Sequence, residues 1–176
     1  MSINKRKQII EVVPYDCNWA NHFLIEATRL EKLFKENFSA IHHIGSTSIP
    51  DMPAKPTIDI VLAVKDIAKV DKLNPEMQKL GYEAWGEYNI PGRRFFVKGE
   101  NKRSHHVHVF QQGSPDITRH ILFRDYFIAN PVDAKEYSKL KIELAEKFRH
   151  NRRAYVVGKQ EFVKRLEAKA LKSFQP

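Results

Sequence analysis

A single carboxylate lies inside an otherwise apolar run of the chain. The segment TIDIVLAV has the length and the β-branched content of a strand, and side chains alternate between the two faces of a strand. One face therefore has Thr57, Asp59, Val61 and Ala63, and the apolar face has Ile58, Ile60, Leu62 and Val64. An unpaired buried carboxylate is costly. We interpret Asp59 as a candidate catalytic residue that lies at a solvated cleft, is paired, or binds a cation.

Two histidines share one face of another predicted strand, SHHVHVF. The alternation places His106 and His108 together with Phe110. With a carboxylate from a neighbouring strand, two imidazoles supply an N,N,O ligand set suited to Zn, Mn or Fe. The alternative is a pair of half-buried, hydrogen-bonded histidines. We keep Asp59, His106 and His108 as candidate metal ligands.

The segment HHIGSTSIP places a Gly-Ser turn directly after a predicted strand. Backbone N–H groups and hydroxyls at Gly45, Ser46 and Thr47 are able to hold a phosphate without a large side chain in the way. Any Gly-Ser turn shares this property, so the pattern alone has low specificity.

Several cations and aromatic residues complete the candidate phosphate-binding set. The cations near the two strands are Lys55, Arg93 and Arg94. Further along the chain, the candidates at helical spacing are Arg124 and two pairs of an aromatic residue with a cation, Tyr137 with Lys141 and Tyr155 with Lys159. Tyr and Lys at i and i+4 share a helix face and can form a base-stacking and phosphate-binding wall. Amphipathic packing, with each lysine extending to water, explains the same spacing. For Arg93 and Arg94 the alternative is that they simply follow a turn.

The elements that position these residues follow from hydrophobic periodicity. Strands are predicted at 7–13, 40–44, 57–64, 90–99 and 104–111, the last two as a hairpin, and helices at 16–34, 66–80, 114–130, 134–149 and 154–172. The order predicts one α+β domain over 1–176. Residues 1–112 form a mixed β-sheet with flanking helices, and residues 113–176 form a C-terminal helical segment.

Composition indicates a globular protein with an anionic partner. The chain has 176 residues, 42% hydrophobic, and one cysteine, Cys17, which excludes an internal disulfide. The formal net charge is +9, and residues 133–176 contain twelve Lys or Arg against six Asp or Glu. Such asymmetry favours binding of an anionic partner such as nucleotide phosphate or nucleic acid. The alternative is that the charges lie on solvated faces of amphipathic helices. We expect a cytoplasmic protein without membrane association, because we find no signal peptide and no apolar stretch long enough to span a bilayer.

The motifs together resemble those of the GrpB family, small bacterial proteins placed among the nucleotidyltransferase-like folds. The matching segments, in the family's order, are VVPYD, IHHIGSTSIP, AKPTIDI, LGY, IPGRRFFVKG, HHVHV, GSP, HILFRDYF and EYSKLK. The resemblance implies a polymerase-β-type fold in which a Gly-Ser turn contacts a triphosphate and strand carboxylates bind two divalent metals. Gly45 and Ser46 match the turn, and Asp59 matches a metal carboxylate.

One departure from the nucleotidyltransferase pattern concerns the second carboxylate. The usual strand carries Asp-x-Asp, but Thr57 and Val61 flank Asp59 at the two possible positions. The third carboxylate is replaced by His106 and His108. Such a donor set suits a softer ion better than Mg²⁺, which prefers oxygen ligands, so Mg or Mn is expected from the resemblance and Zn from the residues.

These observations leave three functions open. The first is a nucleotide-binding protein or nucleotidyltransferase that transfers a group from an NTP to an acceptor. The second is a phosphoester hydrolase in which metal-bound water attacks. The third is a non-catalytic module that binds a nucleotide, another phosphorylated small molecule or RNA; GrpB-like domains also occur fused to dephospho-CoA kinase.

Overall fold

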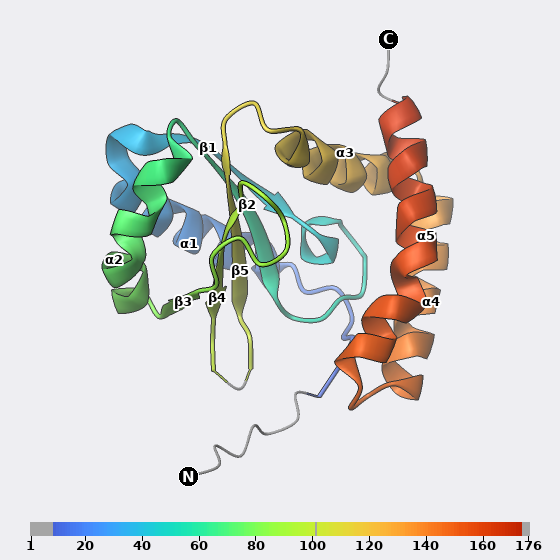
Figure 1. The fold of residues 1–176 in the computed structure, drawn as a ribbon. Helices are drawn as coiled ribbons and strands as arrows, with labels where there is room; N and C mark the ends of the chain where they lie inside the picture. Colours follow the sequence, from blue (N-terminus) through green and yellow to red (C-terminus); the bar gives the residue numbers. More distant parts are fainter. Residues whose placement is uncertain (1–8, 101, 174–176) are drawn as a thin grey trace.

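A five-stranded mixed sheet organises the chain in the computed structural model, which describes residues 9–100 and 102–173 (Figure 1). The strands are β1 (Phe38–Ile44), β2 (Ile58–Val64), β3 (Tyr82–Ala84), β4 (Arg94–Lys98) and β5 (His105–Gln111), in the order β1-β2-β5-β4-β3. Strands β2 and β5 are parallel, and the other neighbours are antiparallel. The predicted mixed sheet and the hairpin of β4 and β5 are confirmed.

Helices cover the two sides of this sheet. They are α1 (Asn18–Phe34), α2 (Asn74–Lys79), α3 (Pro115–Ala129), α4 (Pro131–Lys147) and α5 (Arg152–Ser173), with 3-10 turns at Lys35–Asn37, Ser46–Ser48 and Ile67–Leu73. Figure 1 shows α1 and α2 on one side and the group of α3, α4 and α5 on the other. The predicted α+β class with a helical C-terminal segment is confirmed.

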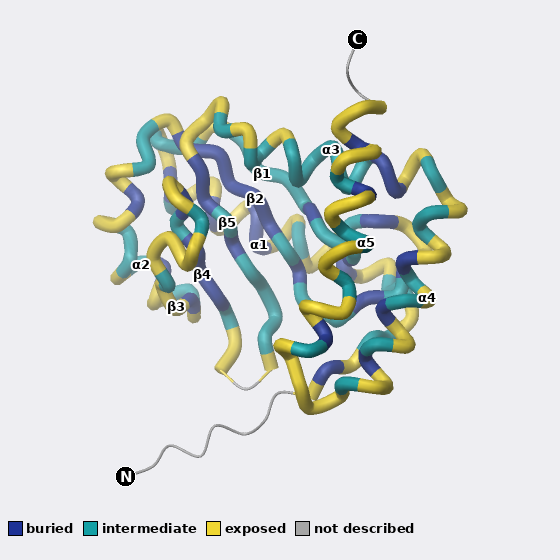
Figure 2. Tube along the Cα trace, turned by 45° about the vertical axis from the view of Figure 1, so that its right-hand side comes forward, coloured by how far each residue is buried: buried dark blue, intermediate teal, exposed yellow. Residues whose placement is uncertain are grey.

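The two faces of β2 pack into different clusters, as the alternation predicted. Its apolar face joins the main core with Trp19, Leu30 and Phe34 of α1. On the opposite face Val61 packs with Ile44 and Phe110. Figure 2 shows the buried residues concentrated along the central strands, whereas the outer surfaces of α4 and α5 are largely exposed.

The predicted first strand is wrong for the residues that the structure describes. In place of a strand, residues 9–13 make one isolated bridge, in which Val13 pairs with Ala54. The backbone N–H of Ile10 instead donates to the carbonyl of Arg149, 2.8 Å away, at the junction of α4 and α5. Pro14 cannot donate and prevents the bridge from extending. Residues 7 and 8 lie outside the described residues.

The C-terminal helices begin where the sequence gives capping signals. The Ser114 side chain accepts a hydrogen bond from the Asp116 N–H, as expected for an N-cap. Pro131, predicted to end one helix, is also the first residue of the next, because the first helical position needs no N–H donor. No helix in the described residues is both long and apolar enough to cross a membrane.

Candidate functional site

Asp59 lies between two imidazoles on the face of the sheet that α1 does not cover. Parallel pairing of β2 with β5 sets Asp59 opposite His106 and Val61 opposite His108. Asp59 Oδ1 is 3.0 Å from His106 Nδ1 and 4.0 Å from His108 Nε2. Burial alone would raise the pKa of Asp59, but the hydrogen bond with His106 and the adjacent ring of His108 hold that pKa well below its usual range. Asp59 is therefore ionised at neutral pH.

Gly45 brings the turn after β1 into direct contact with this carboxylate. Its φ is 71°, and a Cβ at this position would lie 2.8 Å from Asp59 Oδ2. Only glycine combines that backbone conformation with so close an approach. The structure thus brings Gly45 and Asp59 together, although they are far apart in sequence.

The hydroxyl groups of this turn are partly used within the protein. Thr47 is buried, and its Oγ1 is 3.0 Å from His43 Nε2 and 3.5 Å from the Thr57 carbonyl oxygen. The Ser48 hydroxyl donates to the Gly45 carbonyl. The Thr47 hydroxyl is therefore used inside the protein, which does not support its predicted phosphate-binding role. The Ser46 side chain makes no hydrogen bond to the part of the chain that the structure describes.

Three lysines from distant segments converge, and two of them, Lys55 and Lys159, interact with the charge of Asp59; we call Lys55, Lys141 and Lys159 the lysine cluster. Lys55 and Lys159 lie over the ring of Tyr155, with Nζ 5.7 and 5.2 Å from its centroid. Lys141 is 2% exposed and donates to the Pro53 carbonyl at 2.6 Å. Within the described residues, none of the three forms an ion pair.

Burial and mutual repulsion destabilise the charged forms of these lysines. Burial first, and then the charges of Lys159 and Lys55, lower the pKa of Lys141 to about 7. Burial and Lys55 lower the pKa of Lys159 to about 8, while Asp59 acts in the opposite direction. The pKa of Lys55 is also lowered, chiefly by burial. One carboxylate thus faces an excess of cations.

The two tyrosines expected to form a stacking wall are buried. Tyr137 packs between Phe127 and Phe162, with ring centroids 5.1 and 5.6 Å from its own. Tyr155 lies beneath the lysines and packs with Ile10, and burial raises its pKa to about 12. Both rings are buried by protein side chains, so this arrangement does not support the predicted stacking role of Tyr137 and Tyr155.

The two adjacent arginines of the β4 region point to opposite sides. Arg93 is 5% exposed, and its Nη1 is 3.1 Å from His108 Nδ1. Its Nε and Nη2 donate to the carbonyls of Glu87 and Tyr88. Because a guanidinium only donates, His108 Nδ1 accepts, and its Nε2–H is directed toward Asp59. Arg93 therefore orients His108.

Arg94 and Arg124 are paired with other groups of the protein, so this arrangement does not support their predicted phosphate-binding role. Arg94 makes a bidentate pair with Asp71, at 2.7 and 3.0 Å. Arg124 donates to the His43 carbonyl at 3.0 Å and pairs with Asp125, and so links α3 to β1. The alternation along β4 was itself a signal that Arg93 and Arg94 separate.

Two histidines that the sequence analysis did not single out are also packed inside the protein, His43 on the α1 face of the sheet and His120 beside His108. His43 stacks on Phe23 with centroids 4.9 Å apart, and burial lowers its pKa to about 4. His120 of α3 lies 5.4 Å from the ring of His108, and burial lowers its pKa to about 3. The alternation along β1 places His43 beside Ile60 on the α1 face; the position of His120 depends on how α3 packs.

The predicted metal ligands lie together, but His106 is hydrogen bonded to Asp59 and His108 to Arg93. Among residues 9–100 and 102–173, no group of three or more His, Cys, Asp or Glu side chains is arranged to hold a metal ion. His108 uses one nitrogen to accept from Arg93, whose charge also disfavours a second cation. Val61 is fully buried where a second carboxylate was expected. The residues present therefore do not fit a two-metal centre.

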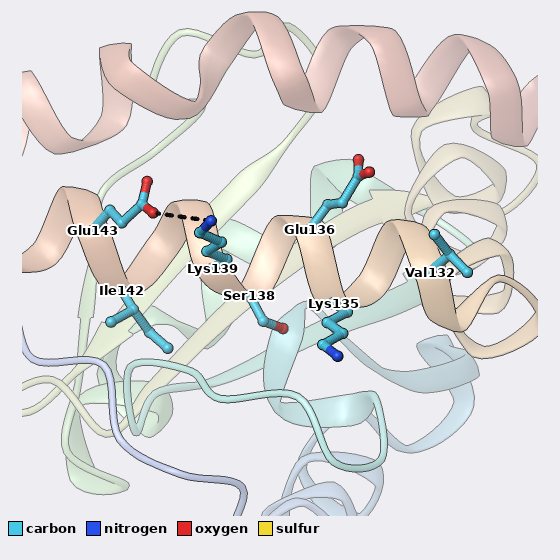
Figure 3. Close-up of a pocket in the computed structure, with 7 residues that line it drawn as sticks. All are labelled: Val132, Lys135, Glu136, Ser138, Lys139, Ile142 and Glu143. Carbon is cyan, nitrogen blue, oxygen red and sulfur yellow. Dashed lines mark ion pairs between the residues drawn. The ribbon is translucent and has the colours of Figure 1, made fainter.

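A hollow along α4 is separate from this site. Figure 3 shows its lining on the surface of one helix, where Lys139 and Glu143 pair at 3.9 Å. The lining residues are Val132, Lys135, Glu136, Ser138, Lys139, Ile142 and Glu143. None of them belongs to the predicted site.

Comparison with known proteins identifies relatives along almost the whole chain. Residues 9–169 match the family model described as GrpB protein. The chain is 47% identical to YqkA of Bacillus subtilis, over 93% of this chain and 48% of that protein. It is 36% identical to the glutamate-rich protein GrpB of Alkalihalophilus pseudofirmus, over 93% and 95%. The chain thus spans about half of YqkA but nearly all of the second relative.

A solved structure shares the fold. The crystal structure of the conserved protein GrpB from Enterococcus faecalis has a TM-score of 0.90 and 41% identity to this chain. The match covers 93% of this chain and 99% of that one.

Proposed function

The chain belongs to the GrpB family, and we propose that its Asp59 site binds the phosphate groups of a nucleotide. The observation that supports this proposal is the lysine cluster, which gathers three cations without an ion-pair partner among the described residues. A fold that holds like charges together incurs repulsion that an anionic ligand relieves.

The three lysines differ in how far they are available to a ligand. Lys141 already donates to the Pro53 carbonyl and lies over Tyr137, with Nζ 4.8 Å from its centroid, so it acts mainly from a distance. Lys55 and Lys159 are only partly buried and flank Tyr155. We assign these two ammonium groups to direct phosphate contact, because lysine binds phosphate as a point charge. The Gly45–Ser46 turn adds backbone N–H donors and the Ser46 hydroxyl.

Binding, rather than transfer or hydrolysis, is the activity that we propose. Nucleotidyl transfer by two metals needs more than one carboxylate, and Val61 occupies the expected second position. A hydrolase with metal on Asp59, His106 and His108 requires donor atoms that are hydrogen bonded in this arrangement. Mg²⁺, Mn²⁺ or Zn²⁺ that arrives with the phosphates would supply further charge neutralisation. Asp59 would then be its carboxylate ligand.

Titration calorimetry with tripolyphosphate and with ATP, each with and without Mg²⁺, tests the proposal. We expect Lys55→Met and Lys159→Met to weaken tripolyphosphate binding about tenfold each, because each removes a charge-assisted contact but keeps the apolar stem. Lys164→Met is the matched control, since Lys164 lies exposed on the same helix and pairs with Glu161. An equal loss in all three variants, or no tripolyphosphate binding by the unsubstituted protein, contradicts the proposal.

A further inference from the structure

An aromatic group borders the Asp59 site on the same face of the sheet. Phe95 is the cross-strand neighbour of His108, and its ring centroid is 4.9 Å from that of His108 and 5.5 Å from that of His106. Tyr88 stacks on Phe95 at 5.5 Å, and Trp85 meets it edge-on at 6.0 Å. Three aromatic rings are thus contiguous with the Asp59 carboxylate.

Arg103 lies over this group with unused hydrogen-bond donors. Its guanidinium carbon is 4.5 Å from the centroid of Trp85. Arg103 Nε and Nη1, Trp85 Nε1 and His106 Nε2 are all buried, and none has a hydrogen-bond partner in the described parts of the chain. His106 directs Nδ1 to Asp59, which leaves its Nε2 for a ligand. The group therefore offers three N–H donors from Arg103 and Trp85 and one further ring nitrogen from His106, and such atoms are costly to bury unpaired.

Arg103 is joined to the segment that carries Lys55, because the Thr57 hydroxyl donates to the Arg103 carbonyl at 3.1 Å. Burial, followed by repulsion from Arg152, lowers the pKa of Arg103, and Arg103 in turn contributes to the lowered pKa of Lys55. Tyr88 is 47% exposed, and both Tyr88 and Asn89 have positive φ, 43° and 65°. The backbone at Tyr88 and Asn89 thus has a conformation that is unusual for these residue types, and it presents the Tyr88 ring on the side of Arg103.

We propose that Trp85, Tyr88 and Arg103, which we call the aromatic subsite, bind the base of the nucleotide whose phosphates contact the lysine cluster. This inference rests on the proposed function. Bases stack on aromatic rings with little dependence on sequence. An arginine fork matches paired acceptors on a base edge, such as O6 and N7 of guanine. The Trp85 indole N–H provides a further donor for the base edge.

Comparison of GTP with tripolyphosphate separates the base from the phosphates. We expect GTP to bind about tenfold more tightly than tripolyphosphate, in line with the usual effect of one stacked base. Tyr88→Ala should weaken GTP binding about tenfold and leave tripolyphosphate binding unchanged, and Arg103→Met should weaken GTP binding about tenfold more than it weakens tripolyphosphate binding. Arg153→Met removes an equal charge from an exposed position on α5 and should change neither. Equal affinities for GTP and tripolyphosphate overturn the base-binding role. Equal losses of affinity for both ligands in the Arg103 variant also overturn it, and indicate that Arg103 contacts an anion instead of a base.

Guanosine provides a readout that needs no phosphate. The chain has two tryptophans, and Trp19 is buried in the main core, so we expect guanosine to quench mainly Trp85 and expect Trp85→Phe to abolish the quenching. If tripolyphosphate fails to bind but guanosine quenches Trp85, the phosphate proposal fails and the aromatic subsite stands. If tripolyphosphate binds and guanosine leaves the fluorescence unchanged up to its solubility, the aromatic subsite is wrong. Far-UV circular dichroism confirms that each variant is folded.

Discussion

At the scale of single residues, Asp59 is held ionised by two imidazoles, and Gly45 packs its backbone against the same carboxylate. A carboxylate beside a phosphate site either repels the ligand or binds a cation that accompanies it. Removing the charge of Asp59 therefore distinguishes phosphate binding that depends on a metal ion from phosphate binding that does not.

Asp59→Asn removes this charge but keeps one oxygen that can accept from His106. Without Mg²⁺, we expect tripolyphosphate to bind the variant at least as tightly as the unsubstituted protein, because the repulsion is gone. If Asp59 is a metal ligand, the Mg²⁺-dependent gain in affinity disappears in the variant. Calorimetry with and without Mg²⁺ measures both effects. A variant that retains the full Mg²⁺ gain excludes Asp59 as the ligand.

Gly45→Ala tests the close contact between the turn and Asp59. Gly113→Ala is the matched control, because Gly113 also has positive φ, 80°, but a Cβ there would meet no atom within 4 Å. Both substitutions cost about 1 kcal/mol of backbone strain. We expect Gly45→Ala to lower the free energy of unfolding by about 1–3 kcal/mol more, since Asp59 must shift. Urea denaturation measures the difference, and equal losses contradict the contact.

At the scale of elements, the site depends on which segments come together. Strands β2 and β5 supply Asp59 and the two imidazoles, whereas the lysine cluster comes from a loop, α4 and α5. The period of each strand predicted the first group. The sequence did not reveal β3, which has three residues, or the replacement of the first strand by a single bridge.

The packing of α4 and α5 makes anion binding dependent on pH. Lys159 has a pKa of about 8 in the free protein, and a bound phosphate favours its charged form and raises that pKa. Binding should therefore take up protons near pH 8, and affinity should fall as pH rises from about 8. Calorimetry in buffers of different ionisation enthalpy detects the uptake. Lys159→Met should reduce it, and an unchanged uptake argues against Lys159 as a contact.

At the scale of the whole molecule, stability should fall in mild acid. His43 and His120 are neutral in the folded protein, with pKa values of about 4 and 3, whereas an unfolded histidine titrates near 6.5. The unfolded chain therefore binds more protons, and stability that is present above pH 6.5 is lost as pH falls toward these lower values.

His120→Asn isolates one part of this effect. At pH 5 the buried His120 should cost about 2 kcal/mol relative to pH 7.5, and the variant should lose correspondingly less on acidification. His150→Asn, at an exposed position, is the control. Urea unfolding at the two pH values gives the comparison. The interpretation fails if both variants lose as much stability as the unsubstituted protein.

Local periodicity by itself determined which residues share a strand face, because alternation is a property of the extended backbone. It therefore placed Asp59 on one face of its own strand, and it placed His106 and His108 together on one face of a second strand. The match of many short motifs also indicated the GrpB family, which the comparisons show.

Only the tertiary structure decided which cations reach Asp59. Lys55, Lys141 and Lys159 converge, whereas Arg94 pairs with Asp71 and Tyr137 packs among phenylalanines. Helical spacing fixes neighbours within one helix but leaves open which surface each helix buries. Contacts between segments that are far apart in sequence depend on packing of the whole chain, and no local pattern specifies them.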